Sequence, residues 1–211
     1  MLFRSLPYEG HPSFASLETE AALLQFFPEQ FPDASGFMPS LIPDFQKNPT
    51  GPLLTVRCSP WHVDGRAVLI GDACHAVVPF LGQGMNAAFE DCVILSRCLA
   101  EHHPDRLRAF RAYEEQRKHH VDTLAELCID NFIEMRDRVS SRAFLLKKKM
   151  EIFLHTLFPR WYLPLYTLVT FTRSPYGDAV RRVRRQNLIV GLLLAGILLG
   201  IALALLSYLW N

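Results

Sequence analysis

The sequence predicts an α/β segment followed by a mainly helical segment that ends in a transmembrane helix. The α/β segment is indicated by a short apolar run at 67–70, which stops at a Gly-Asp pair and leads through a loop into a helix. The helical segment is indicated by apolar residues that recur three, four or seven positions apart within 104–138. Residues 188–210 carry no charged side chain, and at about 1.5 Å per residue they are long enough to cross a hydrocarbon core of ~30 Å.

The composition restricts the classes of function. The length of 211 residues predicts one domain or a piece of a larger one, and a net charge of +1 gives no reason to expect a nucleic-acid partner. Five cysteines without a C-x-x-C pair predict free thiols in a reducing compartment, and not a disulfide framework or a zinc site. None of the eight histidines lies in an H-E-x-x-H motif, so no metal ligand is assigned. The N-terminus does not have the pattern of a secretory signal.

The first part of the chain is predicted to contain an extended segment and two short helices. Residues 1–10 are expected to be a strand that has lost its sheet. Thr19 is expected to cap the N-terminus of a helix that ends or kinks at Pro28, and 39–46 is expected to form a second helix. The buried side of the first helix is predicted to be Leu23, Leu24 and Phe27.

Two strands are predicted before the Gly-Asp pair. The runs 53–58 and 66–70 are apolar and β-branched, and Asp64-Gly65 between them supplies turn residues. Asp72 follows the second strand, where the carboxyl end of a strand usually meets the ligand in an open α/β sheet.

A pair of glycines is predicted to open the next helix. Gly82 and Gly84 have no side chains, so a ligand can approach bare N–H groups at a helix N-terminus, where the helix dipole favours negative charge. Residues 82–87 also match the G-x-G-x-x-G/A dinucleotide fingerprint. That fingerprint should follow a strand directly and precede an acidic residue by about 20 positions, whereas a loop containing Pro79 intervenes here. The pattern therefore predicts a nucleotide or flavin site. The glycine spacing alone does not identify a Rossmann dinucleotide-binding unit.

The remaining chain is predicted to be helical. Helices are expected at 85–100, from Pro104-Asp105 to about 138, at 140–157 and, from a weaker pattern, at 163–172. One face of the first carries Met85, Phe89, Cys92, Ser96 and Leu99. The buried stripe of the second is predicted to be Leu107, Phe110, Val121, Leu124, Cys128 and Met135. Asn131 falls on that stripe, where a polar amide has to find partners. In the third helix, Phe144, Leu145 and Phe153 oppose the run Lys147–Lys149. That run is predicted to be a solvated face, with contact to anionic lipid left open.

The end of the chain is predicted to be a single-pass membrane tail anchor. Tyr208 and Trp210 supply interfacial aromatic side chains at the far end of 188–210. Four arginines within 181–185 flank the near end, which predicts that the rest of the chain is cytoplasmic. The membrane would be the mitochondrial outer membrane in a eukaryote or the inner membrane in a bacterium. The oligomeric state stays open.

Residues 71–92 resemble a known family. Gly71-Asp72-Ala73-Cys74-His75 followed by 79–86 (PFLGQGMN) is similar to the second flavin-binding motif of the FAD-dependent aromatic hydroxylases. The extension 87–92 (AAFEDC) and the downstream segments resemble the kynurenine 3-monooxygenase family within them. The resemblance covers nearly the whole chain but only the C-terminal half of such an enzyme. It implies an α/β fragment of an FAD/NAD(P)-binding Rossmann-like monooxygenase, with the glycines beside the flavin ring.

The resemblance also implies a reaction and a division of the chain. NADPH would reduce FAD, O2 would add to give a flavin hydroperoxide, and L-kynurenine would be hydroxylated to 3-hydroxykynurenine. Because the N-terminal βαβ unit for the ADP portion is not in these residues, the chain alone is expected to be inactive. The division implied is 1–60 (end of the substrate-binding sheet), 61–103 (second half of the FAD-binding domain), 104–187 (helical region closing the active site) and 188–210 (tail anchor).

Site residues follow from the same resemblance. The cofactor-binding residues implied are Asp72, Pro79, Gly82, Gly84, Met85 and Asn86. The residues implied for the small aromatic amino-acid substrate are Phe80, Asn131 and Tyr166. No side chain is implied as an acid or base.

Other roles stay open for these residues and for the chain. Asp72 could cap the following loop, Asn131 could be a buried amide satisfied by backbone, and Tyr166 could be a membrane-proximal anchor. His75 is expected to be structural rather than catalytic. The alternative functions are another membrane-anchored FAD-dependent oxidoreductase, acting on a lipid or quinone, and a non-catalytic tail-anchored remnant.

Overall fold

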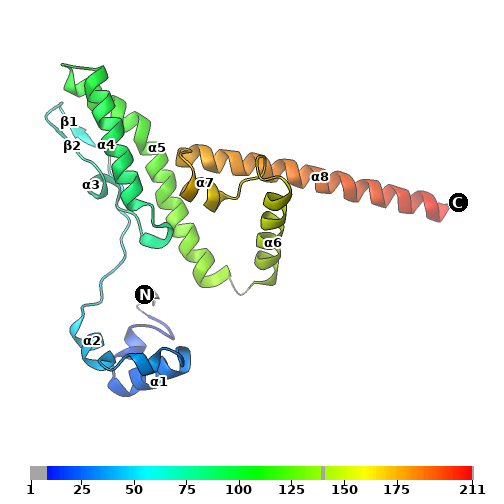
Figure 1. The fold of residues 1–211 in the computed structure, drawn as a ribbon, viewed down its shortest axis with the longest axis horizontal. Helices are drawn as coiled ribbons and strands as arrows, with labels where there is room; N and C mark the ends of the chain where they lie inside the picture. The colour runs from blue at the N-terminus through cyan, green and yellow to red at the C-terminus, as the bar shows by residue number, and fades with distance from the viewer. Residues whose placement is uncertain (1–8, 139–140, 211) are drawn as a thin grey trace. The chain divides into compact units, whose positions relative to one another are not determined.

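The computed structural model describes residues 9–138 and 141–210 (Figure 1). The chain forms two compact units, Met1–Pro52 and Leu53–Asn211, which are described separately. The strand expected within residues 1–10 lies almost wholly outside the described residues. The four-part division of the chain stays a prediction.

The first unit is helical where it is described. Its elements are η1 (Ala15–Leu17), α1 (Glu20–Gln30), η2 (Ser35–Phe37) and α2 (Leu41–Lys47). The Thr19 hydroxyl accepts the Ala22 N–H at 3.2 Å, so the predicted N-cap is confirmed. Leu23 is buried as predicted, but Leu24 is exposed because it points to the opposite side of α1. α1 continues through Pro28, so the helix extends farther than predicted.

The second unit begins with one small hairpin. β1 (His62–Val63) and β2 (Ala67–Val68) pair antiparallel, with His62 opposite Val68. Asp64 and Gly65 both have positive φ, 46° and 65°, and the Arg66 N–H donates to the Val63 carbonyl at 2.8 Å. The predicted turn is therefore confirmed, with the left-handed geometry that suits Asp-Gly.

The strand predicted at 53–58 is wrong. This segment is extended, but the described residues contain no neighbouring strand that could satisfy its backbone, and a strand needs such a partner. It is held instead by single contacts such as the Val56 N–H donating to the Ala76 carbonyl at 2.8 Å. The Rossmann-like sheet thus stays a prediction.

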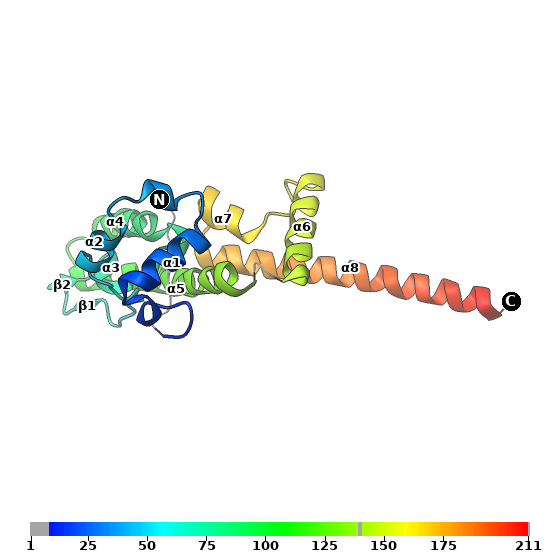
Figure 2. The same cartoon turned by 90° about the horizontal axis from the view of Figure 1, so that it is seen from below.

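Two long helices form the body of this unit. After α3 (Asp72–His75) and η3 (Pro79–Leu81), α4 (Gly84–Glu101) lies against α5 (Arg106–Ile133), as both views show (Figures 1 and 2). A π-helical turn (Glu134–Arg138) extends α5 to the predicted end. The predicted beginning of α4 at the glycine pair is confirmed. Asp105 caps α5 by accepting the Arg108 N–H at 3.0 Å.

The core follows part of the predicted stripe. Phe110, Val121, Leu124 and Cys128 are buried, and they belong to the inner face of α5. Met135 is exposed, contrary to the prediction, because it lies in the π-helical turn, where the side-chain spacing changes. The five cysteines are free, as predicted. Two clusters of buried residues result: Val78, Ala87, Leu124, Cys128, Leu168, Val169, Tyr176 and Ala179; and Trp61, Cys74, Cys98, Ala109, Tyr113 and Val121.

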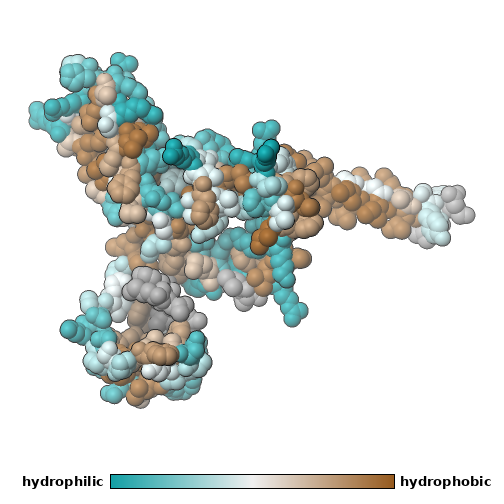
Figure 3. Space-filling model, viewed as in Figure 1, coloured by the Kyte–Doolittle hydropathy of each residue, from teal (hydrophilic) through white to brown (hydrophobic). Residues whose placement is uncertain are grey.

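Three further helices complete the chain. α6 (Arg142–Leu157) is capped by Ser141, α7 (Leu165–Phe171) confirms the weakly predicted helix, and α8 (Tyr176–Trp210) is one continuous helix. Residues 176–208 of α8 have a window of mean hydropathy 2.9 in which no residue is buried, so this helix is long and apolar enough to cross a membrane. Brown, apolar residues cover most of the surface of its C-terminal half in Figure 3.

Candidate functional site

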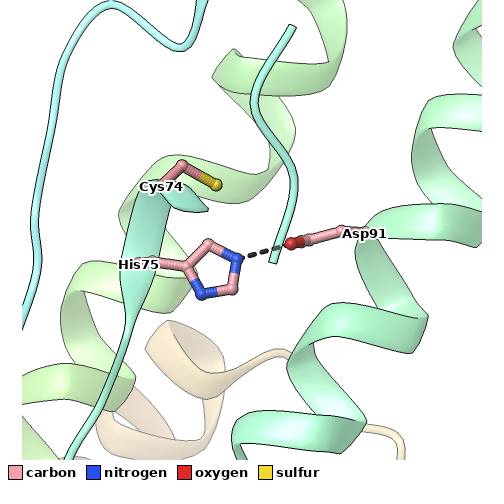
Figure 4. Close-up of side chains that lie close together, drawn as sticks. All are labelled: Cys74, His75 and Asp91. Carbon is pink, nitrogen blue, oxygen red and sulfur yellow. Dashed lines mark hydrogen bonds and ion pairs between the residues drawn. The ribbon is translucent and has the colours of Figure 1, made fainter. Parts of the chain in front are cut away.

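A buried carboxylate links the elements that carry the Gly-Asp pair and the glycine pair. Asp91, on the inner face of α4, is 0% exposed. Its Oδ2 accepts the Gly71 N–H at 3.1 Å and lies 2.5 Å from His75 Nε2, and Figure 4 shows the His75 ring pointing at it. Its Oδ1 accepts Arg117 Nε–H from α5 at 2.7 Å. One side chain therefore fixes the Gly71 turn, α3 and α5 to α4.

The charge state of Asp91 follows from its partners. Burial alone raises the pKa of a carboxyl, but the hydrogen bonds from His75 and Arg117 outweigh burial and hold the pKa of Asp91 below its usual value. Arg117 is 2% exposed, and it also donates to the Ala87 carbonyl at 3.2 Å and pairs with Glu90 at 2.5 Å. The guanidinium is thus neutralised on both sides, which a buried arginine requires.

Cys74, His75 and Asp91 also offer three possible metal ligands within 4.8 Å of one another. Burial and the neighbouring Asp91 raise the pKa of Cys74 to about 12, so the group is a thiol, and its S–H donates to the Gly71 carbonyl at 3.2 Å. Asp91 is already engaged by the cationic Arg117. These contacts make a hydrogen-bonded structural cluster, in agreement with the structural role expected for His75.

The glycine loop presents open backbone at the start of α4. Gly82 is left-handed, with φ 64°, and no side chain caps the helix at Gln83. The first N–H groups of a helix have no partner within it, so those of Gly84, Met85 and Asn86 point beyond the helix end. A Cβ placed on Gly82 would meet nothing within 4 Å, and one on Gly84 only Val77 Cγ2 at 3.7 Å. The backbone at the start of α4 is therefore not covered by neighbouring side chains at these two glycines.

The Gly-Asp pair lies against α4. Gly71 is left-handed, with φ 60°, and a Cβ there would come within 3.2 Å of Ala88 Cβ. Asp72 does not end a strand, contrary to the prediction, because β2 stops at Val68 and the chain turns at Gly71. Asp72 is instead the first residue of α3, and it is exposed.

Two of the predicted substrate residues line one small cavity. Asn131 and Tyr166 lie around a space of about 120 Å³, together with Leu81 of the η3 turn. Asn131 Nδ2 donates to the Phe80 carbonyl at 2.8 Å, and the Phe80 ring packs 4.6 Å from that of Phe132. The side-chain amide of Asn131 is therefore partly satisfied by backbone. The same hydrogen bond holds Phe80 of the η3 turn against α5. The other predicted residues, Pro79, Met85 and Asn86, are exposed.

Sequence reasoning missed Asp91 and Arg117. One signal was present in the sequence. Positions 87, 91, 94 and 98 share one face of a helix, and on that face Asp91 is charged whereas Ala87, Ile94 and Cys98 are small or apolar. Its partner Arg117 lies 26 positions farther along the chain, so no local pattern identifies the pair.

The glycine loop and the tethered Gly-Asp turn lie within a part of the chain that matches a known family model. Residues 45–127 match the family model described as "FAD binding domain". Curated relatives are similar to most of the chain. The chain is 47% identical over 199 residues to a kynurenine 3-monooxygenase of Salinispora arenicola, covering 94% of this chain and 44% of that protein. It is 46% identical over 182 residues to that of Stenotrophomonas maltophilia, covering 86% and 40%, and 43% identical over 185 residues to that of Dictyostelium discoideum, covering 82% and 40%.

The chain is thus a homologue of the kynurenine 3-monooxygenases over most of its own length, and the resemblance found in the sequence is confirmed. It spans less than half the length of the curated relatives it matches.

Proposed function

We propose that this chain forms one part of a membrane-anchored, FAD-dependent monooxygenase that hydroxylates L-kynurenine to 3-hydroxykynurenine with NADPH and O2. The observation that carries the proposal is the open, amide-lined space at the start of α4, held beside the Gly71 turn by Asp91. The similarity to kynurenine 3-monooxygenases supports the substrate, and the matched domain supports FAD. The Rossmann-like unit that would bind the ADP portion lies outside the matched residues in this proposal.

Different residues of this chain would bind the cofactor and the substrate. Bound FAD supplies the electron-transfer and oxygen chemistry. The N–H groups of Gly84, Met85 and Asn86 stabilise negative charge on the ring, because they are fixed at the positive end of α4. The exposed carboxylate of Asp72 accepts a hydrogen bond from a sugar or ribityl hydroxyl. The N–H groups and Asp72 act by binding and orientation, and neither transfers a proton.

The apolar and polar residues behind the loop would serve the substrate. Pro79 and Phe80 form a wall that excludes water from the reacting centre, and the packing of Phe80 against Phe132 keeps that wall in place. Asn131 and Tyr166 orient the amino-acid carboxylate of the substrate from the cavity that they share.

The tail would hold this assembly at a membrane. Residues 188–210 are free of charge, and the four arginines within 181–185 of the same helix favour the cytoplasmic side for the remaining chain. The mitochondrial outer membrane or a bacterial inner membrane is the proposed location.

A chimera tests the proposal. This chain would replace the matching segment of the Salinispora arenicola relative, and purified membranes would be assayed for visible flavin absorbance and for NADPH-dependent 3-hydroxykynurenine. Both signals are expected. Gly84→Val should remove the flavin absorbance, whereas Gly36→Val, where an added side chain also meets open space, should keep it. If Gly84→Val keeps full pigment and activity, the loop is not the flavin site. Oxidation of NADPH with a quinone or lipid, and no product from kynurenine, would favour the alternative oxidoreductase.

A further inference from the structure

The polarity of α6 is inverted. In a soluble protein the apolar stripe of a surface helix faces the core. None of the residues of α6 is buried, and its apolar stripe is exposed to solvent. The stripe has helical spacings of four, three and four, and consists of Leu146, Met150, Phe153 and Leu157.

The polar side of α6 faces the protein. Lys148, Glu151 and His155 line a cavity of about 870 Å³ together with side chains of α5, α7 and α8. Lys148 pairs with Glu134 of the π-helical turn at 3.3 Å and with Glu151 at 3.7 Å. The polar groups on this side are therefore satisfied from within, which leaves the apolar stripe pointing away from α5.

α6 sits where the charge-free part of α8 begins. Hydrogen bonds join the segment after α6 to α8: among them, Tyr162 Oη donates to Asn187 Oδ1 at 3.1 Å, and Gln186 Nε2 donates to the Trp161 carbonyl at 3.2 Å. His155 of α6 lies 2.8 Å from the Tyr162 carbonyl, so the end of α6 is fixed at the same level. Only apolar and uncharged residues follow Asn187 along α8.

The direction of α6 completes this geometry. α6 runs across the axis of α8 in both views, with α5 on one side and the charge-free part of α8 continuing on the other (Figures 1 and 2). Its polar side faces α5, so the stripe faces the side on which 188–210 continues. A helix in this position lies flat on a bilayer whenever α8 stands upright in it.

We propose that the outer face of α6 is an interfacial membrane-binding surface, embedded in the headgroup layer of the bilayer that α8 enters. The proposal rests on the membrane anchor of the proposed function and goes beyond it, because it fixes the height and orientation of the catalytic body above the lipid. An in-plane amphipathic helix of this kind buries its apolar face at the boundary of headgroups and acyl chains.

The chemistry around the stripe matches lipid better than a protein partner. Exposed Phe158 and Trp161 continue the apolar surface beyond α6, and aromatic rings favour the headgroup level. Lys149 borders the stripe on one side, so its stem can cover apolar surface while its ammonium group reaches anionic phosphates. Lys147, on the other side, instead lies 3.9 Å from Glu151 and lines the cavity. An interface with a soluble protein is instead depleted of lysine.

Spin labels on the full chain test this surface. The half-buried thiol of Cys58 and the exposed thiol of Cys92 would be removed by Cys58→Ser and Cys92→Ser, because the other three cysteines are buried. Nitroxides at Leu146→Cys and Phe153→Cys would then report accessibility to O2 and to a water-soluble nickel chelate in vesicles of phosphatidylcholine and phosphatidylglycerol. Arg111→Cys on exposed α5 surface is the water control, and Leu198→Cys is the bilayer control.

The expected result is the same oxygen-to-nickel ratio at both α6 sites, higher than at Arg111→Cys and lower than at Leu198→Cys. A ratio equal to that of the water control overturns the proposal. Low accessibility to both reagents also overturns it, because a polypeptide then covers the stripe. If Leu198→Cys itself behaves as a water-exposed site, the proposed membrane anchor is refuted. This outcome differs from the one in which only the two α6 sites behave as water-exposed.

Discussion

Removing the charge of Asp91 is expected to destabilise the second unit strongly. In Asp91→Asn the 2.7 Å partner of the buried Arg117 loses its charge, and of the carboxylates that pair with Arg117 only Glu90 remains, which is 39% exposed. The Gly71 N–H and His75 also lose a charged acceptor. Breaking a buried ion pair on one side costs about 3–5 kcal/mol. Against a total free energy of unfolding of about 5–15 kcal/mol, this loss is large.

The assay uses the fluorescence of Trp61, which is 1% exposed and whose ring lies 5.6 Å from that of His75. Trp161→Phe and Trp210→Phe would leave it as the single tryptophan of the full chain in detergent. Denaturant midpoints then give the change in the free energy of unfolding.

Glu90→Gln is the matched control, because it removes the other partner of the same guanidinium. That carboxylate is partly exposed, so its loss should cost only about 0–1 kcal/mol. If Asp91→Asn costs no more than Glu90→Gln, the buried network does not support this fold and the reasoning is refuted.

Three other outcomes follow from the same structure. Because the pKa of Asp91 is depressed in the folded state, its contribution to the free energy of unfolding is present at neutral pH. That contribution is lost as pH falls below about 3.8 toward the folded pKa. In Asp91→Asn, stability should therefore fall less steeply on acidification than in the unaltered chain. Gly65→Ala should cost about 1–3 kcal/mol in thermal unfolding, because its φ is +65° and its Cβ would lie 3.0 Å from the backbone nitrogen of Leu107, whereas Gly36→Ala meets open space. Gly82→Ala should cost about 1–2 kcal/mol in denaturant although nothing surrounds the new Cβ, because φ is 64°; no change would contradict the left-handed turn.

The helices were largely predictable because their signals are local. Thr19 caps α1, the glycine pair opens α4 and a Pro-Asp pair precedes α5, and each lies within a few residues of the helix that it starts. The segment 53–58 shows the limit of local patterns. Its β-branched residues suit a strand, but a strand needs a neighbour, and the described part of this chain provides none.

The direction in which a helix face points was not predictable. The helix at 142–157 was predicted, but its faces were only partly right: Lys148 lies 5.2 Å from the centre of the Phe144 ring, which was predicted to oppose the lysine run. The usual inference that an apolar side is buried fails for α6, because Lys148 pairs with Glu134 on the side that faces α5. The same holds for Met85 and Phe89 of α4, which are exposed while Asp91 is buried. Periodicity fixes which residues share a face, and tertiary partners decide where that face points.

The Asp91 network explains how the candidate flavin loop can be in place before any ligand arrives. Every partner of Asp91 lies within 71–117, so the position of the loop depends on contacts inside this chain. Donors that stabilise a developing charge work best when they are fixed beforehand. An apolar pair of similar volume often stabilises a fold as well as a buried ion pair, but it lacks the oriented acceptors that hold the Gly71 amide. Asp91→Asn combined with Arg117→Met is therefore expected to recover part of the lost stability and yet to keep the chimera short of pigment. Recovery of full flavin absorbance in that variant would show that the loop does not need this network.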